Sequence, residues 1–137
     1  MANFVYGKAK QAILNGNVNF SSNNFKLLFV DTSVYTANQN SDEFVSNISN
    51  SAITARSANL SSVTNTLGTV DADNVLLQDY SGASFQAIVM YQVGTSDSNS
   101  RLISYIDTSD GLPFNGTNSL IPVTIVWSDL STKILSL

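Results

Sequence analysis

The sequence predicts a mainly β fold: a single antiparallel β-sandwich or jelly-roll-like domain over residues 1–137, with a short N-terminal helix at about residues 5–15. Apolar side chains occupy every second position along residues 85–93 and 121–127, which is the period of a strand with one buried face. About seven or eight short apolar runs are separated by turn-forming residues, a spacing typical of sandwiches built from short strands.

The first predicted element is the helix. Its apolar residues fall at positions i, i+4, i+7 and i+8 and would share one helix face: Val5, Ala9, Ala12 and Ile13. Asn15 and Gly16 follow, and a glycine after the last turn is a common stop signal. The apolar face could dock a partner, but packing against the rest of its own domain is the favoured interpretation.

The other predicted elements are mainly strands. Residues 25–31, FKLLFVD, are apolar on both faces apart from Lys26, as in a strand that is covered on both sides. Further strands are predicted at residues 53–63 with a bend near Ser57, and at residues 75–78, 85–93, 101–107, 121–127 and 132–137. The side chains expected to form the core are Phe29, Val89, Tyr91, Ile106, Ile125 and Trp127.

The sequence also allows predictions for the polar segments between the strands. A helical turn is predicted at residues 42–47, with Asn40 or Ser41 as its N-cap. Tyr35 and Tyr80 have polar sequence neighbours and are therefore expected to be exposed. Serine, threonine and asparagine make up about a third of the chain, so the surface should be polar but mostly uncharged.

Composition excludes several classes of function. The chain has no cysteine and no histidine, which excludes disulfides, thiol catalysis, Cys–zinc sites and histidine acid–base chemistry. Only 12% of residues are charged and the net charge is -4, so no surface is expected to bind nucleic-acid phosphates. No apolar run approaches the roughly 20 residues that a membrane-spanning helix needs. We therefore expect neither nucleic acid nor a membrane as a partner.

Two runs of the chain end in the same three residues: FVDTS at residues 29–33 and YIDTS at residues 105–109. Aspartic proteases present their two carboxylates on such turns, but the sequence around Asp31 does not match that around Asp107. Caps of local turns explain both aspartates better, and also explain the acidic pairs that hint at calcium. The prediction is therefore a protein that is not an enzyme, with no catalytic, metal-binding or cofactor-binding residues and no cofactor.

Three stretches carry a resemblance to a known family: YGKAKQAILNG (residues 6–16), FKLLFVDTSVY (25–35) and RLISYIDTSDGLPFNG (101–116). They are similar to a recurrent small structural protein of tailed-phage virions, of the head decoration or cement type. The resemblance implies a role on the exterior of the phage head, with the major capsid protein as partner and assembly in the host cytoplasm. Because a capsid lattice offers many three-fold sites, we expect a homotrimer.

The surfaces expected to contact a partner are the N-terminal segment and the loops at residues 32–40 and 108–118, since loops at the ends of a sandwich are free to vary. Their candidate contact residues are Tyr35, Asn38, Asn40, Asp110, Phe114 and Asn115. An alternative function is a component of the phage tail, neck or fibre with a receptor-binding or carbohydrate-binding role. Exposed aromatic side chains gathered in a cleft would favour that alternative.

Overall fold

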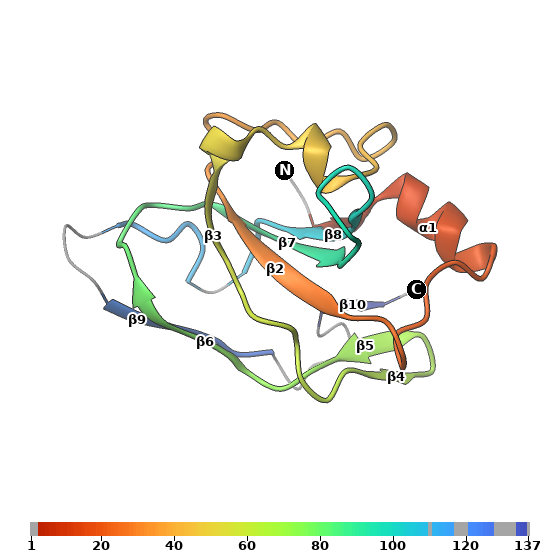
Figure 1. Cartoon of the computed structure of the whole chain (residues 1–137). Helices are drawn as coiled ribbons and strands as arrows, with labels where there is room; N and C mark the ends of the chain where they lie inside the picture. The colour runs from red at the N-terminus through yellow and green to blue at the C-terminus, as the bar shows by residue number, and fades with distance from the viewer. Residues whose placement is uncertain (1–2, 110, 117–120, 128–133, 137) are drawn as a thin grey trace.

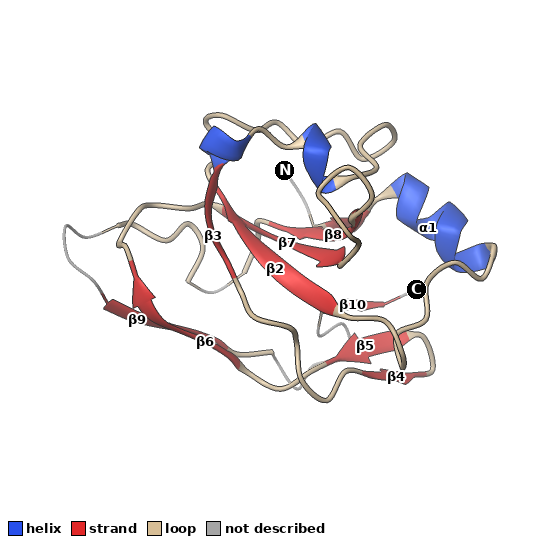
Figure 2. Ribbon diagram, in the orientation of Figure 1, coloured by secondary structure: helices blue, strands red, loops and turns tan. Residues whose placement is uncertain are grey.

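Two layers of antiparallel strands face each other in the computed structural model, which describes residues 3–109, 111–116, 121–127 and 134–136 (Figures 1 and 2). The larger layer is a five-stranded sheet with the spatial order β1-β8-β7-β2-β3. Its strands are β1 (Phe4–Val5), β2 (Phe25–Val30), β3 (Ile53–Arg56), β7 (Ala87–Gln92) and β8 (Arg101–Ile106). The predicted mainly β, antiparallel sandwich with a short N-terminal helix is confirmed.

The second layer consists of two small sheets that lie below the large sheet in Figure 1. One pairs β6 (Val75–Tyr80) with β9 (Ile121–Ile125), and the other has the order β10-β5-β4. The strands of this other sheet are β4 (Thr64–Thr66), β5 (Thr69–Asp71) and β10 (Leu135–Ser136). The sequence did not predict β4 and β5, because their run of threonine and asparagine lacks an apolar alternation.

The opposite face of the large sheet is covered by irregular chain and short helices, at the top and right of Figure 1. These are the segment of residues 31–52 and the helices α1 (Gly7–Leu14), η1 (Val45–Asn47) and η2 (Asn50–Ala52), of which η1 and η2 are single 3₁₀ turns. The buried residues of this cover include Tyr6, Tyr35, Val45, Ile48 and Ala52. The large sheet therefore lies between two covers: a lower cover formed by the two small sheets, and an upper cover formed by α1 and residues 31–52.

Because of this second cover, the prediction that β7 has one buried face is wrong. The alternating pattern predicts one buried face, but residues 87–91 are all buried. Leu28 of β2 lies opposite Val89 on one face of the sheet, and Phe29 lies opposite Ile88 on the other. Both sets of side chains are apolar and both need a covering layer.

The predicted core is largely present. Phe29, Val89 and Tyr91 are at most 3% exposed, and Trp127 is 9% exposed. Ile106 and Ile125 are only partly buried and pack against the edge of the same apolar cluster. The two isoleucines are the last residues of β8 and β9.

Two boundaries predicted from the sequence are wrong. The helix begins at Gly7, because Phe4 and Val5 instead pair with β8 as a short edge strand. The predicted helical turn is the 3₁₀ turn η1, and its cap is neither Asn40 nor Ser41. The side chain of Asn47 accepts the backbone N–H groups of Glu43 and Phe44 at 3.0 and 2.9 Å.

The Phe29→Ala substitution tests the lower cover. The Phe29 side chain is fully buried, and its ring centroid lies 5.1 Å from that of Phe85 and 6.5 Å from that of Tyr80. We expect a loss of about 3–5 kcal/mol in the free energy of unfolding, because the substitution leaves a cavity between the two layers. Urea denaturation measures it, with Leu76→Ala at a half-exposed position as the control. Equal losses in the two variants would contradict the assigned core.

Candidate functional site

The candidate contact residues lie in two loops that follow β2 and β8 at the same end of the large sheet. Because β2 and β8 both pair antiparallel with β7, the two strands run in the same direction. Asn38 and Asn40 are exposed in the first loop, and Asn115 is exposed in the second. Phe114 is half-buried, and Asp110 lies outside the described residues.

Tyr35 is buried, so the expectation that it is exposed is wrong. Its side chain is 6% exposed, and its hydroxyl lies 3.0 Å from that of Tyr6. The Tyr35 hydroxyl donates to Asp42 Oδ2 at 2.6 Å, so the Tyr6 hydroxyl is the donor to Tyr35. Burial raises the pKa of both tyrosines, and Asp42 adds to that effect. This chain of hydrogen bonds ties the start of α1 to the loop above the sheet.

The loop at residues 32–42 is ordered by its own short side chains. Asn38 Oδ1 accepts the N–H groups of Asn40 and Ser41, both at 3.1 Å. Asp42 Oδ2 accepts the N–H of Asn38 at 2.8 Å, and the carbonyl of Gln39 accepts the N–H of Gly7. These bonds hold the backbone of the loop against the start of α1 and leave the Asn38 and Asn40 side chains on the surface.

The second loop is fixed by an aromatic cluster instead. Phe114 stacks on Phe85 with ring centroids 4.9 Å apart, and its ring edge meets Tyr80 at 5.8 Å. Tyr80 is 3% exposed, so the expectation that it is exposed is wrong as well. Its hydroxyl donates to the carbonyl of Ala83. The cluster anchors Phe114 to the core and leaves Asn115, the next residue, exposed.

The two Asp-Thr-Ser turns are local caps. Asp31 Oδ1 accepts the backbone N–H of Ser33 at 2.9 Å and its hydroxyl at 2.6 Å, which lowers the pKa of Asp31. Asp107 Oδ1 accepts the hydroxyl of Thr108, and burial together with Asp107 raises the pKa of Tyr105 to about 12. Since β7 lies between the two strands, the Asp31 and Asp107 backbones are separated by roughly 10 Å, twice the spacing of neighbouring strands. A shared proton needs carboxylates in direct contact.

The described part of the chain offers no cluster of three or more acidic side chains that could hold a metal ion. Its helices include none with the length and apolar character needed to cross a bilayer.

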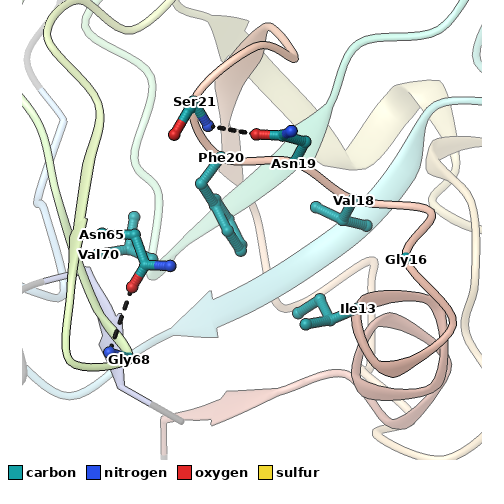
Figure 3. A pocket seen from close by; sticks show the side chains of 9 residues that line it. All are labelled: Ile13, Gly16, Val18, Asn19, Phe20, Ser21, Asn65, Gly68 and Val70. Carbon is teal, nitrogen blue, oxygen red and sulfur yellow. Dashed lines mark hydrogen bonds between the residues drawn. The ribbon is translucent and has the colours of Figure 1, made fainter.

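A groove of about 310 Å³ lies between the end of α1, the connection to β2 and the β4–β5 hairpin (Figure 3). Its apolar lining consists of Ile13, Val18, Phe20 and Val70, and its polar lining of Asn19, Ser21 and Asn65, with two glycines. The sequence analysis missed this groove because its residues come from segments far apart in the chain. The Leu-Gly pair between short β-branched runs is the one local signal, and a weak one, for the hairpin that forms one wall.

Neither a known protein-family model nor a curated protein sequence matches this chain.

The raised pKa values of Tyr6 and Tyr35 predict a loss of stability in alkali. An unfolded tyrosine loses its proton near pH 10. The folded chain keeps these two protons, so the unfolded state binds fewer protons and stability falls as pH rises above 10. We expect Tyr35→Phe to reduce this slope by up to about 1.4 kcal/mol per pH unit. Urea midpoints from pH 8 to 12 measure it, and an unchanged slope would argue against a buried Tyr35.

We also expect no hydrolytic activity on peptide or glycan substrates at acid or neutral pH. Strand β7 separates Asp31 from Asp107, and Asp31 is engaged as the cap of its own turn, so the two carboxylates are not placed to share a proton. Assays of purified protein test this, with Asp31→Asn and Asp107→Asn as paired variants. Turnover that either substitution abolishes would show that the turns are catalytic.

Proposed function

We propose that this chain is a non-enzymatic structural protein of a tailed-phage virion. In this proposal it binds the major capsid protein on the exterior of the head as a homotrimer and stabilises the shell. It assembles onto the particle in the host cytoplasm. The resemblance of residues 6–16, 25–35 and 101–116 to small virion proteins supports this assignment.

The observation that carries the proposal is the ordered loop surface at residues 32–41, which contains no charged side chain. Asn38 and Asp42 accept backbone N–H groups of this loop, so its exposed side chains stand on a fixed backbone. A surface that is already ordered loses little conformational entropy when it binds. Such a surface suits a stable contact with a rigid particle.

The loops at residues 43–52 and 94–100 are ordered in the same way. Asn47 caps η1, and Asn99 Oδ1 accepts the N–H of Ser96 at 3.0 Å. Arg56 holds Asp97 through two N–H···O contacts of 2.8 Å, and the Asp97 carbonyl accepts the N–H of Ser46. The ion pair joins the β7–β8 hairpin to β3, and the backbone bond from Ser46 joins the same hairpin to η1.

A role in the tail, neck or fibre with carbohydrate binding is the alternative. Carbohydrate sites commonly use exposed aromatic rings. Tyr35, Tyr80 and Trp127 are buried, and the exposed large apolar side chains among the described residues are all aliphatic. These observations favour the head over a sugar-binding tail component.

Electron cryomicroscopy of intact particles tests the location directly. We expect density for this chain at three-fold or quasi-three-fold sites on the head exterior. Density confined to the tail would support the alternative and contradict the proposal.

Rebinding to stripped heads tests the surface. Because the loop surface is uncharged, binding should weaken only modestly as salt rises. Asn40→Lys and Asn115→Lys place a charge on the two candidate loops and should weaken binding by roughly tenfold or more, since an unpaired charge at a contact is costly. Ser98→Lys, at an exposed position on the β7–β8 hairpin, is the matched control. A steep loss of binding with salt, or equal effects of all three variants, would argue against this surface.

A further inference from the structure

Leu67 is a fully exposed leucine at the tip of the β4–β5 hairpin. Its side chain is 99% exposed, the largest exposure among the large apolar side chains of the described residues. Asn65, Gly68 and Val70 of the same hairpin line the groove, so Leu67 stands at the rim of the groove without covering it. Leu14, the last residue of α1, is 87% exposed beside Ile13 at the other wall.

The backbone at Leu67 is unfavourable for a leucine. The two residues of the turn, Leu67 and Gly68, have φ of 51° and 84°. Such two-residue turns favour asparagine or glycine at both positions, because a larger side chain is strained in the left-handed region. A leucine here is therefore unfavourable for the isolated chain in two ways, through backbone strain and through exposed apolar area. A contact outside the chain would account for it.

The groove beside it presents apolar and polar surface in about equal parts. Figure 3 shows Ile13, Val18 and Phe20 directed toward its centre. Two of its polar side chains are already engaged within their own loops: Asn19 Oδ1 accepts the N–H of Ser21 at 2.9 Å, and Asn65 Oδ1 accepts the N–H of Gly68 at 3.2 Å. An occupant therefore meets apolar side chains beside polar side chains that are partly engaged within the protein.

Charge also restricts the occupant. The nine residues that line the groove are all uncharged, whereas the chain carries a net charge of -4. The net charges of two acidic copies repel each other, and a contact through uncharged surface adds no further repulsion between like charges at the interface. The groove and the Leu67 turn both offer such uncharged surface.

We propose that the groove receives the Leu67 turn of a second copy of this chain. The donating Leu67 side chain and the receiving groove adjoin, because Gly68 of the same turn lines the groove, and in this arrangement each copy gives one contact and accepts one. Such head-to-tail contacts close into a ring when the rotation between copies allows it. A ring of three copies rests on the proposed function. The contact between two copies does not depend on it.

The first experiment replaces Leu67. Asparagine suits the left-handed turn, so Leu67→Asn should keep the monomer as stable as the parent chain, or more stable, in urea denaturation at low protein concentration. We expect its dissociation constant for self-association to rise by roughly tenfold or more, because one buried leucine is lost from the contact. Sedimentation velocity over a range of concentrations measures this. Leu76→Thr, which removes an exposed leucine from β6, is the matched control and should leave association unchanged.

The second experiment locates the contact. The chain has no cysteine, so single-cysteine variants report on one pair of positions at a time. A mixture of Leu67→Cys with Ser21→Cys at the groove rim should form a disulfide between copies under mild oxidation. A mixture of Leu67→Cys with Ser98→Cys should not. Preferential Leu67-to-Leu67 crosslinks would place hairpin tips against each other and overturn the proposed contact.

The outcomes separate this inference from the proposed function. A chain that stays monomeric at every concentration, or a Leu67→Asn variant that associates like the parent, overturns the inference even if head binding persists. Association through Leu67 by a protein that never binds heads overturns the proposed function and leaves the self-contact in place.

Discussion

Both faces of the central strands β2 and β7 are apolar, and the rest of the structure depends on this constraint. Leu27, Leu28, Phe29 and Val30 are all fully buried, as are Ala87 and Val89 in the neighbouring strand. One face is covered by the two small sheets, through rings such as Tyr80 that meet Phe29. The other face is covered by α1 and residues 31–52, most of which are irregular chain. A sheet that must be covered twice in a chain of 137 residues therefore uses loops as a covering layer.

That use of loops explains the composition. Irregular backbone cannot satisfy its own N–H groups through helix or sheet ladders, so side chains must accept them. Asp31, Asn38 and Asn47 each accept such groups two to four residues away, and short polar side chains are suited to this geometry. Part of the high content of serine, threonine and asparagine thus serves to order the upper cover. Its consequence is a surface that is ordered yet carries little charge, which a binding protein can use without catalytic chemistry.

The sequence predicted burial correctly where the residues of one element are enough to show which of its faces are covered. FKLLFVD is apolar on both faces and forms β2, covered on both sides as predicted. The prediction of one buried face was wrong for β7. Ile88 and Met90, which lie between the alternating positions, are also apolar, so the strand has a second buried face. The predicted exposure of Tyr35 was wrong for a different reason. Its sequence neighbours are polar, and only the fold brings Tyr6 to its hydroxyl. The groove is predictable least of all, since α1, the following connection and the β4–β5 hairpin meet only in the folded chain.

The exposed leucine suggests how association could be confined to a particle. One leucine in one groove buries far less than the roughly 1,200–2,000 Å² of a standard stable interface, so isolated copies would associate weakly. The net charge of -4 on each copy opposes association further while the copies are free. On a lattice that holds several copies side by side, the effective concentration of the Leu67 turn near the next groove is much higher. The same weak contact then adds to binding only where copies are already assembled, and this would account for a strained leucine that is more exposed than any other large apolar side chain of the described residues.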